Sequence, residues 1–425
     1  MTTFKEYKLG DIADIVVSNV DKKITPNQKT VKLCNFVDVY HNWAITKNNY
    51  DSFMTATASD EEISKFSLKK GQVAFTKDSE TRDDIGIPAY IAEDFKDVVL
   101  GYHTALATPD ENIVTGEYLN AFMHSSYIQK YFELNATGSG MRYTLSQQTL
   151  HDIPVLAPDL DSQYKIGSLL SKIDRKISVN REINRNLEEL AKQIYDYWFV
   201  QFDFPNEDGK PYKSSGGKMI WNETLKRDIP IGWEVKKINE LAEIQKYQIT
   251  PKENIEYKHY SLPNFDKYES YSIENGNSIF SDKFFVENGN LLISKLNPWT
   301  DRTVWVDNVK NAICSTEYVV LKQKDKCIQS YLNQIAHTQS FIDYCTSCST
   351  GTSHSHRRVK PELMTGYKIP FQENIVKAFG KQTYQIIKKK LNIQNENRNL
   401  ITLRDELLPL LMSGQVTLNS CLSAD

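Results

Sequence analysis

The chain contains the same pattern of residues twice, 213 positions apart. The shared residues are Tyr118, Leu119, Asn120, His124, Tyr131, Thr137 and Gly138 in the first copy, and Tyr331, Leu332, Asn333, His337, Tyr344, Thr350 and Gly351 in the second. The tetrapeptide Asn184–Leu187 returns at Asn397–Leu400 with the same offset, which becomes 216 at the Ile-Pro pairs ending in Pro154 and Pro370. A period of this length indicates a duplicated domain rather than a solenoid repeat. We therefore expect two similar domains with an approximate two-fold relation.

Each copy begins with a segment of mixed secondary structure, residues 1–155 in the first copy and residues 231–370 in the second. These segments are rich in aromatic and β-branched residues, and turn-forming residues interrupt them. Two runs that follow a glycine predict strands, namely Gln72–Thr76 and Asn290–Ser294. Two runs that end before the Thr-Gly pair predict single helices, namely Tyr118–Tyr131 and Tyr331–Tyr344. The sequence thus predicts two mixed α/β domains.

Each copy ends in a segment with the pattern of a long helix, residues 156–200 and residues 371–425. Apolar residues recur there every seven positions, which indicates a coiled-coil seam: Ile166, Ile173, Leu187 and Ile194 in the first copy, and Phe379, Ile386, Ile393, Leu400 and Leu407 in the second. Asn180 interrupts the first stripe once. A companion stripe of Ile183, Leu190 and Tyr197 has only Leu403 and Leu410 as its apolar counterparts.

The narrow stripe limits how these helices can be packed. As a helix, residues 162–199 span roughly 57 Å at about 1.5 Å per residue, and such a helix has too little apolar surface to stand alone. We expect the two helices to pack on each other as an antiparallel coiled coil, which suits two-fold related copies. The alternative is that each helix folds back on its own domain. The predicted fold class is therefore α+β, with two similar α/β domains joined by two long helices. Residues 201–230, rich in Pro, Gly and Ser, are expected to form a linker.

Composition and targeting signals restrict the class of protein further. Lys and Arg total 51 and Asp and Glu total 54, which gives a net charge of −3 and argues against a polycationic nucleic-acid binder. The first residues lack the apolar run of a signal peptide, and no stretch is apolar enough to span a membrane. The six cysteines are irregularly spaced and do not form a disulfide framework. We expect a cytoplasmic protein with reduced thiols.

Three segments resemble one known family. The run Glu188–Asp203, which contains a Trp-Phe-Val-x-Phe-Asp sequence, resembles the central conserved region of type I restriction-modification specificity subunits. The run Ile229–Val235 resembles the entry to that family's second target recognition domain, and Ile153–Ile166 resembles the entry to its first conserved helix. The second copy departs from the pattern, since Phe371–Ile375 lacks the Pro and Gln of the first.

The resemblance implies a division of the chain and a set of partners. Residues 1–155 and 231–370 would be target recognition domains, and the long helices would be conserved spacers. The chain would be a non-catalytic subunit that binds double-stranded DNA, two adenine methyltransferase subunits and, through them, restriction subunits. It would hold no cofactor itself, since S-adenosylmethionine belongs to the methyltransferase partner and ATP and Mg²⁺ belong to the restriction partner.

Two sequence patterns suggest other chemistry, but each is better explained without it. Asn297, Pro298 and Trp299 resemble part of the box with which adenine methyltransferases hold a flipped base, but no glycine-rich cofactor loop precedes them. Cys345 and Cys348 have zinc-ligand spacing and precede His354 and His356, but the first copy has Phe132 and Asn135 in place of the cysteines. We expect neither catalysis nor a metal.

Two loops in each copy are the candidate DNA-reading segments, and each pair differs between the copies. The first loop follows the glycine-preceded strand and the second follows the Thr-Gly pair. Arg suits this role because its fork can bind guanine bidentately, while Asn, Ser and His offer other base contacts. The candidates are Lys77, Ser79, Arg82, Arg142 and Tyr143 in the first copy, and Lys295, Asn297, Arg302, His354, His356, Arg357 and Arg358 in the second.

The shared framework and the diverged loops together predict a bipartite, asymmetric target. Each domain would read a different half-site, and the paired helices would set the spacer between them. The main alternative is a coiled-coil adaptor that binds only proteins. A further alternative is an autonomous methyltransferase, which would have to bind S-adenosylmethionine by itself.

Overall fold

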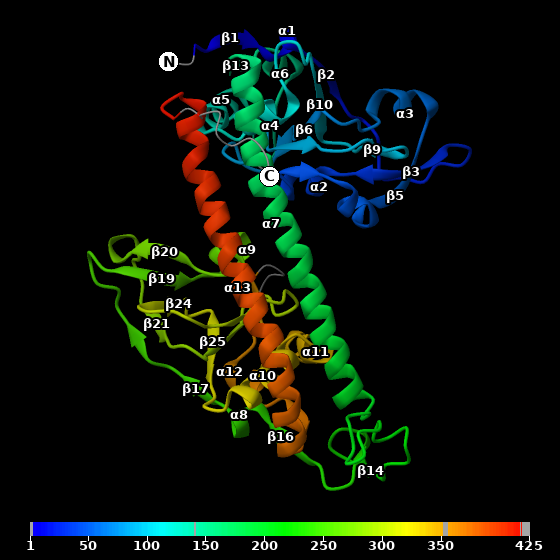
Figure 1. Ribbon diagram of the computed structural model, residues 1–425, viewed down its shortest axis with the longest axis vertical. Coiled ribbons are helices and arrows are strands. Elements are labelled where there is room, and N and C mark those ends of the chain that lie inside the picture. Colours follow the sequence, from blue (N-terminus) through cyan, green and yellow to red (C-terminus); the bar gives the residue numbers. More distant parts are fainter. Residues whose placement is uncertain (1–2, 140–141, 352–355, 417, 419–425) are drawn as a thin grey trace. The chain divides into compact units, whose positions relative to one another are not determined.

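The computed structural model describes residues 3–139, 142–351, 356–416 and 418, and it divides into two compact units (Figure 1). Unit 1 consists of residues 1–177 and 400–425, and unit 2 consists of residues 178–399. Both unit boundaries fall inside the two long helices, so each unit contains one mixed domain and a part of each helix. Among the described residues, no helix is both long and apolar enough to cross a membrane.

The mixed domain of unit 1 is built on a five-stranded sheet with the order β2-β10-β6-β8-β4. A three-stranded sheet, β5-β3-β9, packs beside it, and two smaller sheets are formed by β11-β12-β7 and β1-β13. The elements are β1 (Lys5–Lys8), α1 (Leu9–Ile12), β2 (Ala13–Val17), β3 (Lys29–Cys34), α2 (Phe36–His41), β4 (Ala44–Ile45), η1 (Lys47–Ser52), β5 (Met54–Ala58), α3 (Asp60–Phe66), β6 (Val73–Thr76), β7 (Asp78–Ser79), β8 (Pro88–Ile91), β9 (Val98–Leu100), β10 (Thr104–Pro109), α4 (Gly116–Met123), α5 (Ser126–Asn135), β11 (Thr137–Ser139), β12 (Arg142–Thr144), α6 (Gln147–His151) and β13 (Pro154–Ala157).

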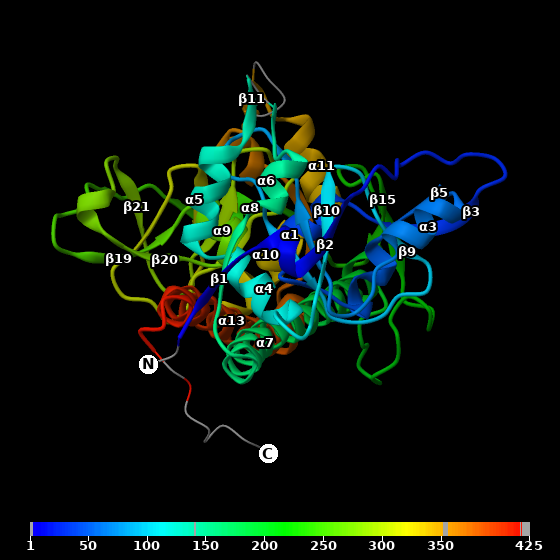
Figure 2. The same cartoon turned by 90° about the horizontal axis from the view of Figure 1, so that it is seen from above.

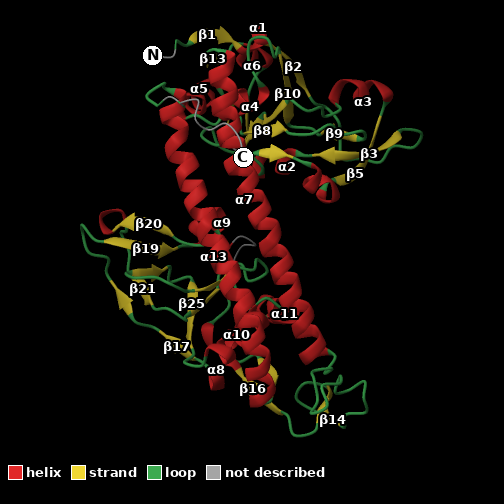
Figure 3. Cartoon of the chain, viewed as in Figure 1, coloured by secondary structure: helices red, strands yellow, loops and turns green. Residues whose placement is uncertain are grey.

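The mixed domain of unit 2 contains sheets with the orders β17-β25-β22-β23 and β18-β21-β24-β19-β20, and the pair β16-β26. Figure 3 shows helices and strands interspersed in both domains. The elements are β16 (Glu234–Lys237), α8 (Ile238–Leu241), β17 (Glu243–Gln245), β18 (Gln248–Ile249), β19 (Glu256–Tyr260), α9 (Leu262–Tyr268), β20 (Ser272–Asn275), η3 (Gly276–Ser278), β21 (Lys283–Val286), β22 (Leu291–Ser294), β23 (Thr303–Trp305), β24 (Ala312–Cys314), β25 (Tyr318–Lys322), α10 (Lys326–Ala336), α11 (Gln339–Ser347), α12 (Pro361–Thr365) and β26 (Lys368–Phe371).

The strand pairing repeats between the domains and confirms the duplication. The order β2-β10-β6-β8 corresponds to β17-β25-β22-β23, with every pair antiparallel. In the other sheet β3 pairs antiparallel with β5 and parallel with β9, as β19 pairs with β20 and β24. The buried Tyr118 donates its hydroxyl to the carbonyl of Leu156, and Tyr331 donates to the carbonyl of Pro370, both at 2.5 Å. The repeated tyrosine therefore ties a helix to the last strand of each domain.

The helices predicted over Tyr118–Tyr131 and Tyr331–Tyr344 are each two helices. In the first domain α4 ends at Met123 and α5 begins at Ser126, and in the second α10 ends at Ala336 and α11 begins at Gln339. The residues before the second helices, Ser125 and Thr338, cap them by accepting the backbone N–H groups of Ile128 and Phe341. The prediction was wrong because the apolar spacing carries across this break, while the cap residue starts a new helix.

The two long helices are antiparallel, as predicted. They are α7 (Leu160–Tyr195), which continues as a π-helical turn (Asp196–Val200), and α13 (Glu373–Met412). Within unit 2, Asn180 bonds Asn397 at 2.9 Å and Glu188 pairs with Lys390. Within unit 1, Asp174 lies 3.9 Å from Arg404. The residue numbers of the paired side chains rise along one helix and fall along the other, so the two helices are antiparallel.

The seam of the helix pair includes the predicted residues and only part of the companion stripe. Every predicted seam residue is buried or partly buried. In the companion stripe, Ile183 and Leu410 are partly buried, whereas the other three residues are exposed, namely Leu190, Tyr197 and Leu403. The second row of the α7 seam lies three or four residues from the first, as heptad packing requires, and consists of Leu170, Ile177, Asn184, Ala191 and Trp198. Asn180 does not break the seam, since its buried amide donates to Asn397 and Glu396.

The ends of the long helices complete the hydrophobic cores of the two units. In unit 1 the start of α7 packs through Ile166 and Leu170, and the end of α13 enters the same core through Leu408, Leu411 and Met412. In unit 2 the start of α13 packs through Val376 and Phe379, and Tyr195 at the end of α7 enters the core together with Trp198 and Phe199 of the π-helical turn. Each helix therefore packs on its own domain and also on its antiparallel partner.

Residues 201–230 are more structured than the predicted linker. They contain the hairpin of β14 (Met219–Asn222) and β15 (Arg227–Pro230), and Phe202, Phe204 and Ile229 belong to the core of unit 2. Arg227 donates to the carbonyl of Phe199 at 2.5 Å and stacks on the ring of Phe202. The turn-forming residues were read correctly as turns, but the aromatic residues between them bury this segment.

The seam assignment predicts unequal effects for two leucines of one helix. Leu170→Ala should lower the free energy of unfolding by about 2–5 kcal/mol, because Leu170 is fully buried and its removal leaves a cavity. The matched control Leu190→Ala should change it by less than about 0.5 kcal/mol, because Leu190 is exposed. Urea unfolding followed by circular dichroism measures both, and equal losses would refute the assigned seam.

Candidate nucleic-acid interface

The two loops predicted to read DNA in the first domain form one small sheet. Strand β7 comes from the first loop, and β11 and β12 come from the second. The register places Tyr143 opposite Ser79 and Thr144 opposite Asp78. In Figure 2, β11 projects beyond α5 and α6 of the same unit. Residues more than 60 positions apart in the sequence thus lie side by side.

The five predicted residues of the first domain differ in their exposure and contacts. Arg82 is exposed and stacks over the Tyr143 ring, 5.0 Å from its centroid. Arg142 is exposed, with its Nη2 3.5 Å from Nδ1 of His103. Lys77 is only 20% exposed and donates to Thr144 at 2.9 Å, so it supports the sheet as well as carrying charge. Ser79 is partly buried, and its hydroxyl accepts the N–H of Thr81.

A third segment, residues 102–103, joins this site and was missed by the sequence reasoning. The N–H of Lys77 donates to the carbonyl of His103 at 2.9 Å, and the N–H of Leu145 donates to the carbonyl of Lys77 at 2.9 Å. Nδ1 of His103 lies 2.5 Å from Asp78, and the ring of Tyr102 packs on the imidazole at 3.7 Å. His103 has a φ of +71°, a rare conformation for a residue other than glycine.

The carboxylate of Asp78 holds this cluster together. Partial burial acts to raise the pKa of Asp78, but hydrogen bonds from Thr144 and His103 and the charge of Lys77 outweigh it, so the pKa is lowered. Asp78 therefore stays ionised beside His103. Its position in the sequence, directly after Lys77, gave no indication of this role.

The second domain brings its two predicted loops together in the same way. The N–H of Lys295 donates to the carbonyl of Glu317 at 2.8 Å, and the N–H of Val359 donates to the carbonyl of Lys295 at 3.1 Å. Arg358 bridges to Thr350 and to Leu296, as Thr144 pairs with Thr137 and Asp78 in the first domain. Arg358 thus occupies the place of Thr144, even though Arg358 and Arg142 each lie twelve residues before the proline of their Ile-Pro pairs.

Two arginines of the second domain are paired with carboxylates. Arg302 is 17% exposed and binds Asp266 through Nε and Nη2 at 2.7 and 3.1 Å. Arg358 binds Glu317 through the same two nitrogens at 3.0–3.2 Å, and these contacts raise its pKa. Arg357 donates to the carbonyl of Ser349 at 2.7 Å.

The other predicted residues of this domain lie in or beside the same loops. Asn297 donates its N–H to the carbonyl of Arg357, with a φ of +48°. Lys295 is partly buried and His356 is exposed, while His354 lies outside the described residues.

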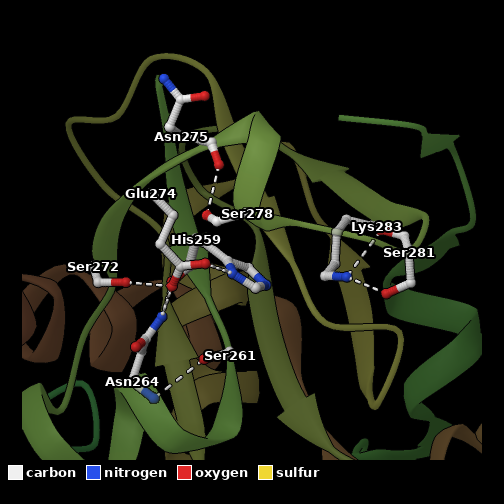
Figure 4. A network of polar contacts seen from close by, with 9 residues as sticks. All are labelled: His259, Ser261, Asn264, Ser272, Glu274, Asn275, Ser278, Ser281 and Lys283. Carbon is white, nitrogen blue, oxygen red and sulfur yellow. Dashed lines mark hydrogen bonds and ion pairs between the residues drawn. The ribbon is translucent and has the colours of Figure 1, made fainter. Parts of the chain in front are cut away.

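A partly buried polar network fixes the helix that carries Asp266 (Figure 4). Glu274 on β20 accepts hydrogen bonds from Ser272 and Asn264 and lies 2.7 Å from Nδ1 of His259 on β19. Burial acts to raise the pKa of Glu274, but these bonds outweigh it and lower the pKa. Since Asn264 lies in α9 with Asp266, the network positions the carboxylate that holds Arg302.

The repeated Thr-Gly pair has a steric explanation. A Cβ at Gly138 would lie 2.2 Å from the carbonyl oxygen of Arg142, and Gly138 has a φ of +137°. A Cβ at Gly351 would lie 2.7 Å from the carbonyl oxygen of His356. In both domains glycine permits the close approach of the two arms of the second loop.

The residues that suggested metal binding or methyl transfer lie in ordinary elements. Cys345 is buried in α11, Cys348 follows at its end, and burial raises the pKa of the Cys345 thiol to about 12. Across residues 3–139, 142–351, 356–416 and 418, no three His, Cys, Asp or Glu side chains are grouped so that they could hold a metal ion. Asn297 and Trp299 lie in the turn after β22.

The glycine contact predicts a local effect of one methyl group. Gly138→Ala should separate β11 from β12 and speed hydrogen exchange of the amides in residues 142–145, because the added Cβ meets the Arg142 carbonyl. Gly209→Ala is the control, since Gly209 also has a positive φ but nothing within 4 Å of a Cβ. Exchange measured by mass spectrometry should change at 142–145 only for the first variant, and unchanged exchange there would contradict the steric explanation.

The amino-acid sequence is similar to those of type I restriction enzyme specificity subunits. Residues 1–189 match the type I restriction modification DNA specificity domain. The chain is 24% identical over 492 residues to the type I restriction enzyme HindI specificity subunit of Haemophilus influenzae, covering 98% of this chain and 100% of the relative. It is 21% identical over 320 residues to the MjaIX specificity subunit of Methanocaldococcus jannaschii, covering 72% and 70%.

A solved structure shares the fold of the whole chain. The crystal structure of a type I restriction-modification S subunit from M. genitalium matches with a TM-score of 0.56 and 15% identity over 96% of both chains. The sequence relatives and the domain match agree with the resemblance read from residues 153–235. By sequence and by fold, the chain is therefore similar to type I restriction-modification specificity subunits.

Proposed function

We propose that this chain reads a bipartite, asymmetric DNA sequence and directs adenine methyltransferase subunits to it. The observation that carries the proposal is the pair of small reading sites built on one repeated scaffold. In both domains two distant loops join at the same lysine, Lys77 or Lys295, through equivalent backbone hydrogen bonds. The side chains around these lysines differ between the domains, so each domain would read a different half-site.

The proposed reading surface has the residue types that bind base edges. Arg82, Arg142 and Arg358 are exposed, and an arginine fork can bind the O6 and N7 of guanine. Tyr143, Ser79 and Asn297 add hydrogen-bonding groups beside them.

The partners belong to the same proposal. Two methyltransferase subunits would dock on the repeated scaffold, one for each copy, and restriction subunits would join through them in the cytoplasm. The chain would supply no catalytic group. S-adenosylmethionine would bind to the methyltransferase, and ATP and Mg²⁺ to the restriction subunit.

The distribution of charge supports shared binding of DNA. Residues 1–155 carry 15 basic and 21 acidic residues, a net charge of −6, and residues 231–370 carry 17 and 16, a net charge of +1. An acidic domain gains little from phosphate neutralisation. We propose that local loops select the bases while the methyltransferases provide much of the contact with phosphate.

Methylation of host DNA tests the bipartite target. Co-expression with a type I methyltransferase subunit should produce methyladenine at one motif with two unlike halves and a fixed spacer, read by single-molecule sequencing. Adding seven residues to each long helix should lengthen the spacer and leave both half-sites unchanged, because the seam repeats every seven residues. The absence of any specific methylation would refute the proposed function, and an unchanged spacer would refute the role of the helices alone.

Binding of DNA by the purified chain tests the division of labour. The chain alone should bind duplex DNA weakly, and its affinity should fall steeply between 50 mM and 200 mM salt, whereas the complex with methyltransferase should bind tightly. Gel shifts with random duplex and with the methylated motif measure this. No DNA dependence in either form would favour the protein-binding adaptor, and tight binding by the chain alone at physiological salt would contradict the shared-contact proposal.

A further inference from the structure

The two reading sites share a third segment at equivalent backbone positions. His103 precedes β10 and Glu317 precedes β25, the corresponding strands of the two sheets. Each offers its carbonyl to the N–H of the lysine at which the two predicted loops meet, at 2.9 Å for Lys77 and 2.8 Å for Lys295. The backbone of this position is therefore fixed in both domains while its side chain differs.

Both domains have an ion pair around this position, but its two side chains come from different positions in each domain. In the first domain the three facing positions hold Asp78, His103 and Thr144, and the carboxylate of Asp78 pairs with the imidazole. In the second domain the same positions hold Leu296, Glu317 and Arg358, and the carboxylate of Glu317 pairs with the guanidinium. Each site has one carboxylate and one nitrogen-bearing partner. The carboxylate is at the position of Asp78 and Leu296 in the first domain, and at the position of His103 and Glu317 in the second.

The pairing leaves a defined edge of each nitrogen-bearing side chain for a ligand. Asp78 engages Nδ1 of His103, whose side chain is 34% exposed, so Nε2 is the ring nitrogen that remains to meet a base. Glu317 engages Nε and Nη2 of Arg358, whose side chain is 47% exposed, and Nη1 donates to the carbonyl of His356 at 3.4 Å. These contacts use three of the five N–H groups of the guanidinium, so its Nη1–Nη2 edge keeps one N–H on each nitrogen for a base. That edge matches the O6 and N7 of guanine. A carboxylate behind each group restricts its orientation before DNA arrives.

We propose that His103 and Arg358 are base-reading residues of the two half-sites, and that Asp78 and Glu317 are the positioning residues that aim them. This inference rests on the proposed function and specifies which side chains decide its sequence. His103 is new to the set of candidate residues. For Arg358, the new element is that Glu317 orients its guanidinium.

The experiment uses the complex with the methyltransferase and compares His103→Ala with Glu317→Gln. His103→Ala should lower the preference for the cognate base pair about 10-fold or more at one position of one half-site, because a specific base contact is lost. Glu317→Gln should do the same in the other half-site only, since it releases Arg358 without removing it. Competition binding against duplexes altered at each base pair, with methylome sequencing of the variants, measures both effects.

Two substitutions elsewhere serve as matched controls. His151→Ala removes a half-exposed histidine on α6 of the same domain, and Glu287→Gln removes an ion pair with Lys322 on the strand that follows Glu317. Neither should change the preference at any base pair.

A conservative variant tests whether the carboxylate itself is needed. Compared with Glu317→Gln, Glu317→Asp should keep part of the preference, because a shorter carboxylate can still contact Arg358.

The outcomes separate this inference from the proposed function. Half-site-specific relaxation supports the inference, as does loss of cognate binding with retained binding to random duplex. An unchanged motif in both variants overturns the inference while leaving the proposed function intact. Loss of binding to cognate and random duplex alike overturns it too, because both positions would then belong to the scaffold. A wild-type complex that methylates no defined motif would instead refute the proposed function.

Discussion

The structure depends on the way in which each long helix takes part in two hydrophobic cores. The last turns of α13 bury Leu408, Leu411 and Met412 in unit 1, and the end of α7 with its π-helical turn buries Tyr195, Trp198 and Phe199 in unit 2. Full burial of one such side chain contributes about 1.5–3 kcal/mol. Neither core is closed by its own copy of the repeat alone, because each also buries apolar side chains from the long helix of the other copy. The aromatic run that carried the family resemblance is thus part of a core.

Comparison of the two copies separates scaffold residues with the same contacts in both domains from site residues whose side chains differ. Gly167 and Gly380 lie where a Cβ would meet the domain, 2.8 Å from Glu117 in one copy and 2.2 Å from the Cys327 carbonyl in the other. Tyr118 and Tyr331 make the same hydroxyl contact with the last strand. Around the central lysine only the backbone hydrogen bonds are shared, and the side chains have changed. A scaffold fixed by sterics and backbone pairing can therefore present two different sets of side chains.

The sequence predicted the main architecture and failed where the answer depends on distant contacts. The heptad stripe through Ile166 and Phe379 identified one row of the seam, because that row is continuous along the helix. The second row was missed since it includes the polar Asn184 and the small Ala191, whose burial only the neighbouring helix reveals. The candidate loops were found from the repeat, but the carboxylates that hold Arg302 and Arg358 come from α9 and from the start of β25.

The sequence by itself determined the duplication, the resemblance to one family, the long amphipathic helices and the two loops that differ between the copies, because these leave periodic or repeated local patterns. Only the tertiary structure decided that the loops meet at Lys77 and Lys295, and that His103 and Glu317 complete the two sites. Those contacts are backbone hydrogen bonds between segments separated by tens of residues. Such bonds use N–H and C=O groups that every residue except proline carries in full, so no local pattern of side chains records which segments they join.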